Sequence, residues 1–477
     1  MNGVSCRYIP GGQLEGTGFQ LNDLWKFEFE ERVLLLDRQG HILLMKRELY
    51  DSIRNQKISD DLLLKLLQRK LACDMGQTQK CETNDPLEIK PMFFMIDLTN
   101  KCNMGCHYCL RSIENDPEED SISDEMIDAI CEYLAQYCSQ VEDKRITLQP
   151  WGGEPLLEKE KIFLLQDGMK KRGVNPQITI ETNSLLLSEK LIEELYRREI
   201  SIGVSIDGYQ EVHDSQRVSR SGIGTHQIVE KRIRNIQKWF EKDISTITTI
   251  TRNSLEHLED IIEYLAVDLG VMHIKLNFVH RSCFAMNDDL CLSPEEIGDA
   301  SLRIFRKILE LHKRDIEVYE YNIWLKSMNL LTDKRLDVCY SNGCHGGKRM
   351  IAIDKNGDIF PCDVTDFPEE RLGNISKDRD LIALLEKSAR EKPYFKEKKG
   401  AECGMCSWWH YCRGGCTVHM KCAAEEQDVD IIECTINRNL YPQLIALILQ
   451  EPESMNKLLG YELLEKRPLD EYRETTV

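Results

Sequence analysis

The sequence predicts an α/β protein with a parallel sheet of six β/α units, a small module before it and a cysteine-rich domain after it. Residues 92–278 alternate short apolar stretches with amphipathic ones, which is typical of parallel strands covered by helices. Strand and helix patterns of a different kind occupy residues 1–90. Residues 339–436 hold nine cysteines and little periodicity, as expected of a domain folded around metal.

The first 90 residues are expected to contain a β-hairpin and helices. The run from Trp25 to Asp37 predicts one strand, residues 38–41 a turn, and residues 42–45 a second strand. Ser59 is a candidate helix cap before the sequence LLLKLLQRKL. This combination suggests a winged-helix-like module. The alternative is a structural extension of the next domain.

The next unit, residues 91–281, should bring its reactive site to the carboxyl ends of the strands, whether the sheet forms a partial barrel or is doubly wound. The expected strands are Phe93–Leu98, Ile146–Gln149, Gln177–Glu181, Ser201–Ile206, Ser245–Thr251 and His273–Phe278, with helices near 122–139, 158–171, 188–198, 226–241 and 254–266.

Residues 282–338 are expected to form a helical bridge. Ser293, followed by proline and two glutamates, is a good helix start. Residues 339–436 form the cysteine-rich domain, and residues 437–477 are expected to end the chain with a helix and a charged tail.

The charge balance limits the choice of partners. There are 62 basic and 81 acidic residues, a formal charge of −19, which disfavours nucleic acid because that binding depends on cationic contacts with phosphates. The first residues do not resemble a signal peptide, and the apolar run at 440–449 is too short to span a membrane. We therefore expect a cytoplasmic protein with neither nucleic acid nor a membrane as partner.

Three of the nineteen cysteines, Cys102, Cys106 and Cys109, directly follow the first expected strand of the sheet. In a reducing compartment such a cysteine count points to metal. Three thiolates on one loop can bind three irons of a [4Fe–4S] cube and leave the fourth iron open. Zinc would normally need a fourth ligand, and His107 in that role would strain the loop.

This loop resembles the signature of the radical S-adenosylmethionine (radical SAM) superfamily. The resemblance implies a partial (β/α)6 TIM-like barrel in which S-adenosyl-L-methionine binds the open iron and is cleaved to a 5′-deoxyadenosyl radical. Further matches follow other strands, and by resemblance they bind the cofactor. They are Gly152, Gly153 and Glu154 for its amino group, Asn183 in a TNG-type turn, Ser205, Arg217 for its carboxylate and Tyr108 beside its adenine.

The spacing of the C-terminal cysteines resembles that of the SPASM domain found in radical SAM enzymes that modify peptides and proteins. The resemblance implies two auxiliary [4Fe–4S] clusters, hence three in all. The implied ligands are Cys339, Cys344, Cys362 and Cys416 for one cluster and Cys403, Cys406, Cys412 and Cys434 for the other. The Cys403–Cys406 pair would also suit a zinc ribbon. Cys422 is left over, and the cysteines outside these sets lack metal spacing.

Asp363 directly follows Cys362. In the related anaerobic sulfatase maturases, an aspartate at this motif position is a general base on the substrate. The alternative is that Asp363 only hydrogen-bonds within the cluster loop.

The module before the cysteine loop resembles the leader-recognition domain of enzymes that modify ribosomally made peptides. These features predict an oxidoreductase acting on a precursor peptide with a leader and forming thioether crosslinks from cysteine sulfur to carbon, with flavodoxin or ferredoxin as electron donor. The alternatives are formylglycine formation in a sulfatase, carbon–carbon crosslinking, and a non-catalytic iron–sulfur electron carrier or scaffold.

Overall fold

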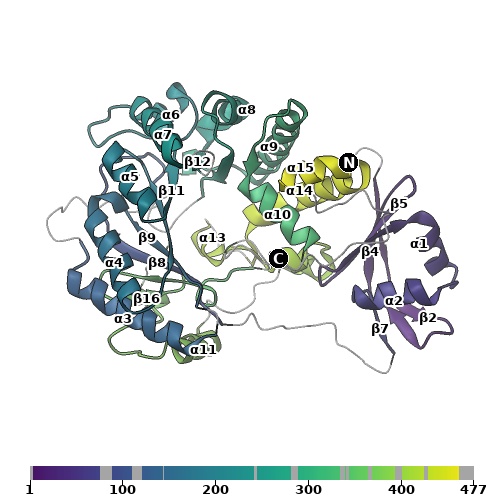
Figure 1. Ribbon diagram of the computed structural model, residues 1–477. Helices are drawn as coiled ribbons and strands as arrows, with labels where there is room; N and C mark the ends of the chain where they lie inside the picture. Colours follow the sequence, from purple (N-terminus) through teal and green to yellow (C-terminus); the bar gives the residue numbers. More distant parts are fainter. Residues whose placement is uncertain are drawn as a thin grey trace.

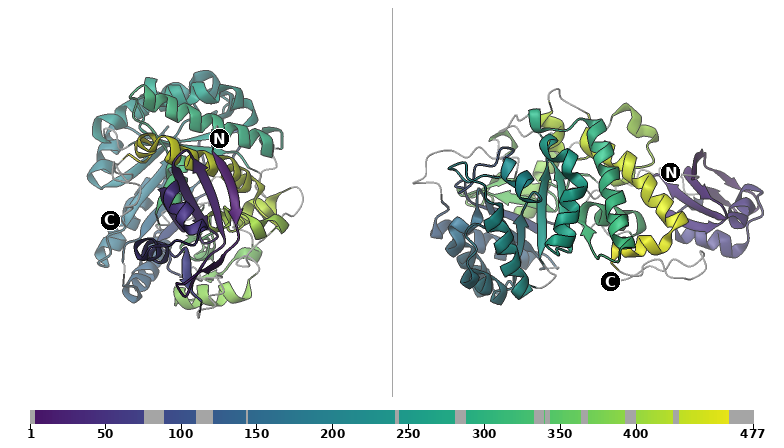
Figure 2. Two further views of the ribbon diagram at one scale, coloured as in Figure 1. Left: turned by 90° about the vertical axis from the view of Figure 1, so that its right-hand side faces the viewer. Right: turned by 90° about the horizontal axis from the view of Figure 1, so that it is seen from above.

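A computed structural model describes residues 4–75, 89–109, 121–142, 144–240, 244–280, 288–332, 339, 343–363, 368–392, 400–423 and 428–460. Figure 1 shows a barrel-like α/β unit on the left, C-terminal helices in the middle and the N-terminal module on the right. Figure 2 shows the same order from above. The N-terminal module therefore adjoins the C-terminal helices on the side away from the barrel strands.

The central sheet confirms the predicted α/β unit. Its strand order is β14-β13-β12-β11-β10-β9-β8-β15-β16-β17, and neighbouring strands from β14 through β8 to β15 are parallel. The strands are β8 (Phe93–Thr99), β9 (Thr147–Gly152), β10 (Gln177–Thr182), β11 (Ile200–Ser205), β12 (Ser245–Ile250), β13 (His273–Phe278) and β14 (Tyr319–Glu320). The helices are α3 (Asp124–Gln140), α4 (Lys159–Lys171), α5 (Glu189–Arg197), α6 (Gln210–Gln216), α7 (His226–Phe240) and α8 (Leu258–Glu263).

The N-terminal module differs from the predicted hairpin. Residues 25–37, expected as one strand, form two antiparallel strands, because the chain reverses at Glu30, whose φ is +48°. The predicted hairpin with its turn at residues 38–41 and the helix capped by Ser59 are present. The elements are β1 (Ser5–Ile9), β2 (Gly12–Leu14), β3 (Phe19–Leu21), β4 (Leu24–Phe29), β5 (Arg32–Asp37), β6 (Ile42–Lys46), α1 (Arg47–Arg54), α2 (Asp60–Gln68) and β7 (Ala72–Asp74). They form two sheets, of order β1-β4-β5-β6 and β2-β3-β7.

Beyond the barrel, α9 (Pro294–Lys313) begins at Ser293 with the predicted capping box. The helix expected from residue 437 begins earlier, because Asp430 caps α14 (Ile431–Gln450). The other elements are α10 (Tyr321–Leu331), β15 (Met350–Ile353), β16 (Asp358–Phe360), β17 (Gly373–Asn374), α11 (Leu381–Glu391), α12 (Trp409–Cys412), α13 (Thr417–Cys422) and α15 (Pro452–Leu459).

The apolar core is unevenly distributed. One large cluster of buried side chains runs through the barrel and the C-terminal helices, and a second fills the N-terminal module. A much smaller cluster, which includes Cys362 and Val418, lies among the C-terminal cysteines. None of the helices in the described residues has the length and apolar character needed to cross a membrane.

Candidate functional site

The three-cysteine loop opens into a cavity at the carboxyl ends of the barrel strands. Cys102, Cys106 and Cys109 line this cavity, whose volume is about 420 Å³, and we call it the loop cavity. Burial, with smaller contributions from the nearby Glu154, Cys106 and Cys109, raises the pKa of the Cys102 thiol to about 11. Iron binding must therefore displace the proton, as for any thiolate ligand.

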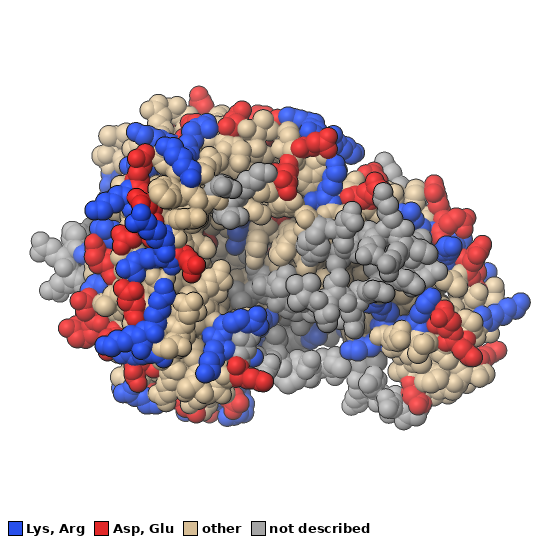
Figure 3. All heavy atoms as spheres, in the orientation of Figure 1, with Lys and Arg blue, Asp and Glu red and all other residues tan. Residues whose placement is uncertain are grey.

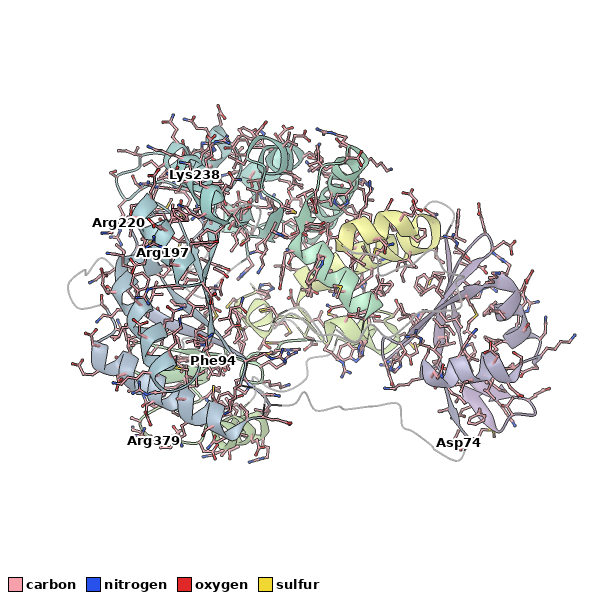
Figure 4. All side chains as sticks on the ribbon, viewed as in Figure 1. Asp74, Phe94, Arg197, Arg220, Lys238 and Arg379 are labelled. Atoms are coloured by element: carbon pink, nitrogen blue, oxygen red, sulfur yellow. The ribbon has the colours of Figure 1, made fainter. Side chains whose placement is uncertain are left out.

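The backbone of this loop is held by the chain between residues 216 and 220. The Gly105 amide donates to the Val218 carbonyl over 2.9 Å, and the His107 amide donates to the Gln216 carbonyl over 3.0 Å. Arg220, labelled in Figure 4, donates from Nε to the Cys102 carbonyl over 2.6 Å. These bonds fix the loop without metal. The His107 side chain is exposed, which favours three cysteine ligands over a closed zinc site.

A buried polar network positions the side chains beside the cysteines. The Tyr108 hydroxyl donates to Asp207 Oδ2 over 2.7 Å and accepts a hydrogen bond from Arg217. Asp207 also accepts from the Thr249 amide over 2.9 Å and from the Gln216 side chain over 2.9 Å. Asp207 thus holds Tyr108 in place.

Arg217 fits an anionic ligand. Its side chain lines the loop cavity, and its Nε is buried without a hydrogen-bond partner among the described residues. A buried N–H donor without an acceptor costs free energy unless a ligand accepts its hydrogen bond. A carboxylate is the usual partner of a guanidinium. The predicted contact with the cofactor carboxylate is consistent with this geometry.

The Gly152-Gly153-Glu154 segment packs directly on the cysteine loop. The Glu154 amide donates to the Lys101 carbonyl over 2.9 Å, and a Cβ on Gly153 would lie 2.3 Å from the same oxygen. The backbone approach therefore requires glycine. The Glu154 carboxylate accepts hydrogen bonds from Thr182 and from the Leu156 and Asn183 amides, so it joins two strand ends, and its predicted contact with the methionine amino group stays a prediction.

Two other predicted residues lie at the same edge. Asn183 donates to the Asn103 side chain over 2.7 Å, and its Nδ2 lies 3.9 Å from Cys102 Sγ. Ser205, at the end of β11, lines the loop cavity. Thus residues following four strands converge here, as expected for a parallel sheet.

The C-terminal cysteines gather in two groups. Burial raises the pKa of the Cys416 thiol, and the nearby Cys344 and Cys362 contribute to this rise. Cys339 packs with Cys362 and Cys416 in the small cluster. In the second group, Cys434 interacts with Cys403 and Cys406, and Cys412 interacts with Cys434. Among the described residues, no three Cys, His, Asp or Glu side chains converge on a single ion position. Thiolates that bind separate irons of a cube do not need to converge in this way.

The leftover Cys422 is disulfide-bonded, unlike the other described cysteines, which are free thiols. Of the cysteines without metal spacing, Cys131 and Cys138 are buried in α3 and Cys6 is exposed. Cys81 and Cys283 lie outside the described residues.

Asp363 does not line the loop cavity. It lines a second cavity of about 1010 Å³, which lies along the inner faces of the strands and also reaches Cys339. Sequence reasoning missed Asp207 and Gln216, although Asp207 lies only two residues after the predicted Ser205. Their hydrogen bonds join residues far apart in the chain, so no local pattern signals them.

The family comparisons match two parts of the chain. Residues 96–265 match the Radical SAM superfamily, and residues 344–413 match SPASM, an iron–sulfur cluster-binding domain. The chain is 23% identical over 354 residues to a cysteine-type anaerobic sulfatase-maturating enzyme of Clostridium perfringens, covering 69% of this chain and 89% of that protein. It is 24% identical to the serine-type enzyme of Klebsiella aerogenes, covering 68% and 79%.

Solved structures share the fold. The structure of anSMEcpe with bound AdoMet and the Cp18Cys peptide has a TM-score of 0.64 at 19% identity, covering 75% of this chain and 99% of that one. Streptococcus suis SuiB bound to its precursor peptide SuiA has a TM-score of 0.51 at 15% identity, covering 80% and 79%. The chain therefore combines a radical SAM domain, whose fold binds S-adenosyl-L-methionine at an iron–sulfur cluster, with a SPASM domain.

Proposed function

We propose that this enzyme of the radical SAM type, with its SPASM domain, forms thioether crosslinks from cysteine sulfur to carbon in a ribosomally synthesised precursor peptide. The observation that best supports this proposal is that the three-cysteine loop and the C-terminal cysteine-rich domain both border the loop cavity. Cys106 lines it from the barrel, and Cys339 and His419 line it from the cluster domain. A substrate group there would reach both.

Thioether formation requires that two hydrogen atoms be removed from the peptide. Joining carbon to sulfur removes one hydrogen from each atom. The cofactor, when bound and reduced by a donor such as flavodoxin or ferredoxin, supplies the radical that takes the hydrogen atom. The thiol proton then needs a base and the remaining electron an acceptor. The C-terminal cysteines, such as Cys344 and Cys412, would hold two auxiliary clusters, three in all, which would supply an electron acceptor, and we assign the base role to Asp363.

The N-terminal module supports a peptide substrate. Strand β1 lies at the edge of its sheet and pairs with β4 on one side, and no other described strand pairs with its outer side. Its side chains are largely exposed. A leader peptide can add to such an edge as an extra strand. The module also abuts the cluster domain, since Phe27 stacks on Trp408 at 5.9 Å.

Formylglycine formation is the second candidate, because curated relatives are sulfatase-maturating enzymes and Asp363 faces a cavity. Co-expression with a short cysteine-rich peptide encoded beside the gene, followed by mass spectrometry, separates the two. A crosslink removes two hydrogens, retains sulfur and blocks thiol alkylation. Formylglycine made from cysteine loses sulfur and yields a hydrazide-reactive aldehyde. An unmodified peptide, while 5′-deoxyadenosine is still released, would contradict crosslinking of that peptide.

A further inference from the structure

The loop cavity and the second cavity meet inside the barrel. Trp151, Glu181, Lys275, Asn277 and Cys339 line both cavities, and we call them the junction. Burial alternates along the strands here. On β10, Ile180 is buried against the helices, whereas Glu181 is only partly buried and borders the cavities. The inner face of this barrel is therefore hollow and carries charged side chains such as Glu181 and Lys275 among apolar ones, whereas a closed barrel interior is usually packed with branched apolar side chains.

The junction contains one cation, Lys275, and one carboxylate, Glu181, and a second carboxylate, Glu320, lines the loop cavity. Lys275 interacts with both Glu181 and Glu320, and its Nζ lies 5.2 Å from the centre of the Tyr321 ring. The ring contact places the ammonium group beside Tyr321, and a lysine ammonium group carries three N–H donors. Its position on β13 puts it across the barrel from β10, since β11 and β12 lie between these strands.

The two carboxylates differ in how many hydrogen bonds the protein donates to them. Glu320 accepts hydrogen bonds from the Leu276 amide over 3.0 Å, the Ile323 amide over 2.9 Å and the Asn322 side chain over 3.2 Å. Within the described part of the chain, the hydrogen-bond partner of Glu181 is Gln149. A carboxylate offers about four acceptor sites, so Glu181 faces the cavities with acceptor capacity to spare.

We infer that Glu181 and Lys275 bind the main chain of the substrate peptide at the junction. Glu181 accepts a hydrogen bond from a peptide N–H, and Lys275 donates one to a peptide carbonyl. An extended peptide presents both groups at every residue, whatever its side chains. Holding the main chain there would leave one side chain for the loop cavity and a neighbouring one for the second cavity. This inference rests on the proposed function and names the substrate-positioning residues.

A minimal probe tests the inference without knowledge of the natural peptide. N-acetylalanine methylamide has the peptide groups and no thiol that could bind iron, and the matching methyl ester lacks the terminal N–H. Binding to the cluster-loaded enzyme is measured by saturation-transfer NMR at the millimolar concentrations expected for so small a ligand. The wild type should prefer the amide by about 10-fold, as for a hydrogen bond to a charged group.

Substitutions of Glu181 and Lys275 test the acceptor and donor roles separately. Glu181→Ala should abolish the preference for amide over ester, and Glu181→Gln, which keeps an acceptor, should reduce it. Lys275→Met should weaken amide and ester alike. Glu320→Gln is the matched control, because it should lower thermal stability and leave the preference unchanged. Equal binding of both probes by the wild type, no binding, or an unchanged preference in both Glu181 variants overturns the inference. Crosslinking of a co-expressed peptide is measured separately, so the proposed function can stand if this inference fails.

Discussion

The two cysteine regions of this molecule are built in opposite ways. In the barrel, a short loop is pinned by hydrogen bonds such as Gly105 to Val218 and lies on a large apolar core. In the cluster domain, eight candidate ligands come from separated segments. A small apolar cluster lies among them, while other side chains of the domain, such as Trp408 and Tyr411, join the large core. The protein thus preorganises the barrel site, whereas we expect metal to hold the separated ligand segments of the cluster domain together. Figure 3 shows acidic and basic side chains interspersed over the visible face of the barrel unit and the N-terminal module.

The largest expected effect is the loss of activity, without loss of the fold, when a cysteine of the barrel loop is replaced. Cys106→Ala should abolish reductive cleavage of S-adenosyl-L-methionine, because the cube loses one of its three protein ligands. The secondary structure should survive, since the loop backbone is held without metal. The measurements are 5′-deoxyadenosine release and circular dichroism. Cys138→Ala, at a buried cysteine of α3, is the control and should keep activity. Release by Cys106→Ala would refute the assignment of the active cluster.

The sequence predicted the barrel better than the regions around it. The six strands were found because each is short, apolar and followed by an amphipathic helix, and the cysteine loop has a local spacing. The reversal at Glu30 was missed because the residues on both sides continue one β pattern. Trp408 stacks on Phe27 and Tyr441, which lie far away from it in the sequence. Such long-range packing has no local signal.

The second prediction tests the metal dependence of the cluster domain. Cys412→Ala should reduce the iron content from about twelve to about eight per chain, because one of three cubes loses a ligand. The C-terminal domain should become more sensitive to proteolysis, while cofactor cleavage without peptide persists. The assays are iron and sulfide analysis, limited proteolysis and 5′-deoxyadenosine release. An unchanged iron content, or about four irons with zinc present in the wild type, would contradict the auxiliary clusters.

The third prediction is a pH dependence specific to the barrel. Burial, with Arg217 and His226 nearby, lowers the pKa of His213 to about 2. His213 Nδ1 accepts from the Asp207 amide over 3.2 Å, and Nε2 lies 3.0 Å from the Thr225 hydroxyl. The folded state therefore keeps the imidazole neutral, while the unfolded state binds a proton below about pH 6.5.

Stability from this group is complete above pH 6.5 and falls as the pH drops toward 2. At pH 5 the loss is about 2 kcal/mol, from 1.36 kcal/mol per pH unit. Urea unfolding followed by near-ultraviolet circular dichroism measures it. His213→Gln, which cannot titrate, should be less stable at pH 7.5 but should show a flatter dependence between pH 7.5 and 5. Equal slopes for the two proteins would exclude His213 as the cause.

The smallest effect is expected at the helix that joins the two regions. Ser293 caps α9 by accepting from the Glu296 amide over 3.2 Å, so Ser293→Ala should cost about 1 kcal/mol. Helix α9 packs closely on α14, since a Cβ on Gly298 would lie 2.9 Å from the Asn439 side chain. Helix α14 carries Cys434 near its start. Because metal rather than α9 is proposed to hold that cysteine, thermal unfolding should shift slightly while the iron content stays the same. Loss of about four irons in Ser293→Ala would show that the cluster domain depends on the barrel-side helices for its fold, and the contrast between the two regions would fail.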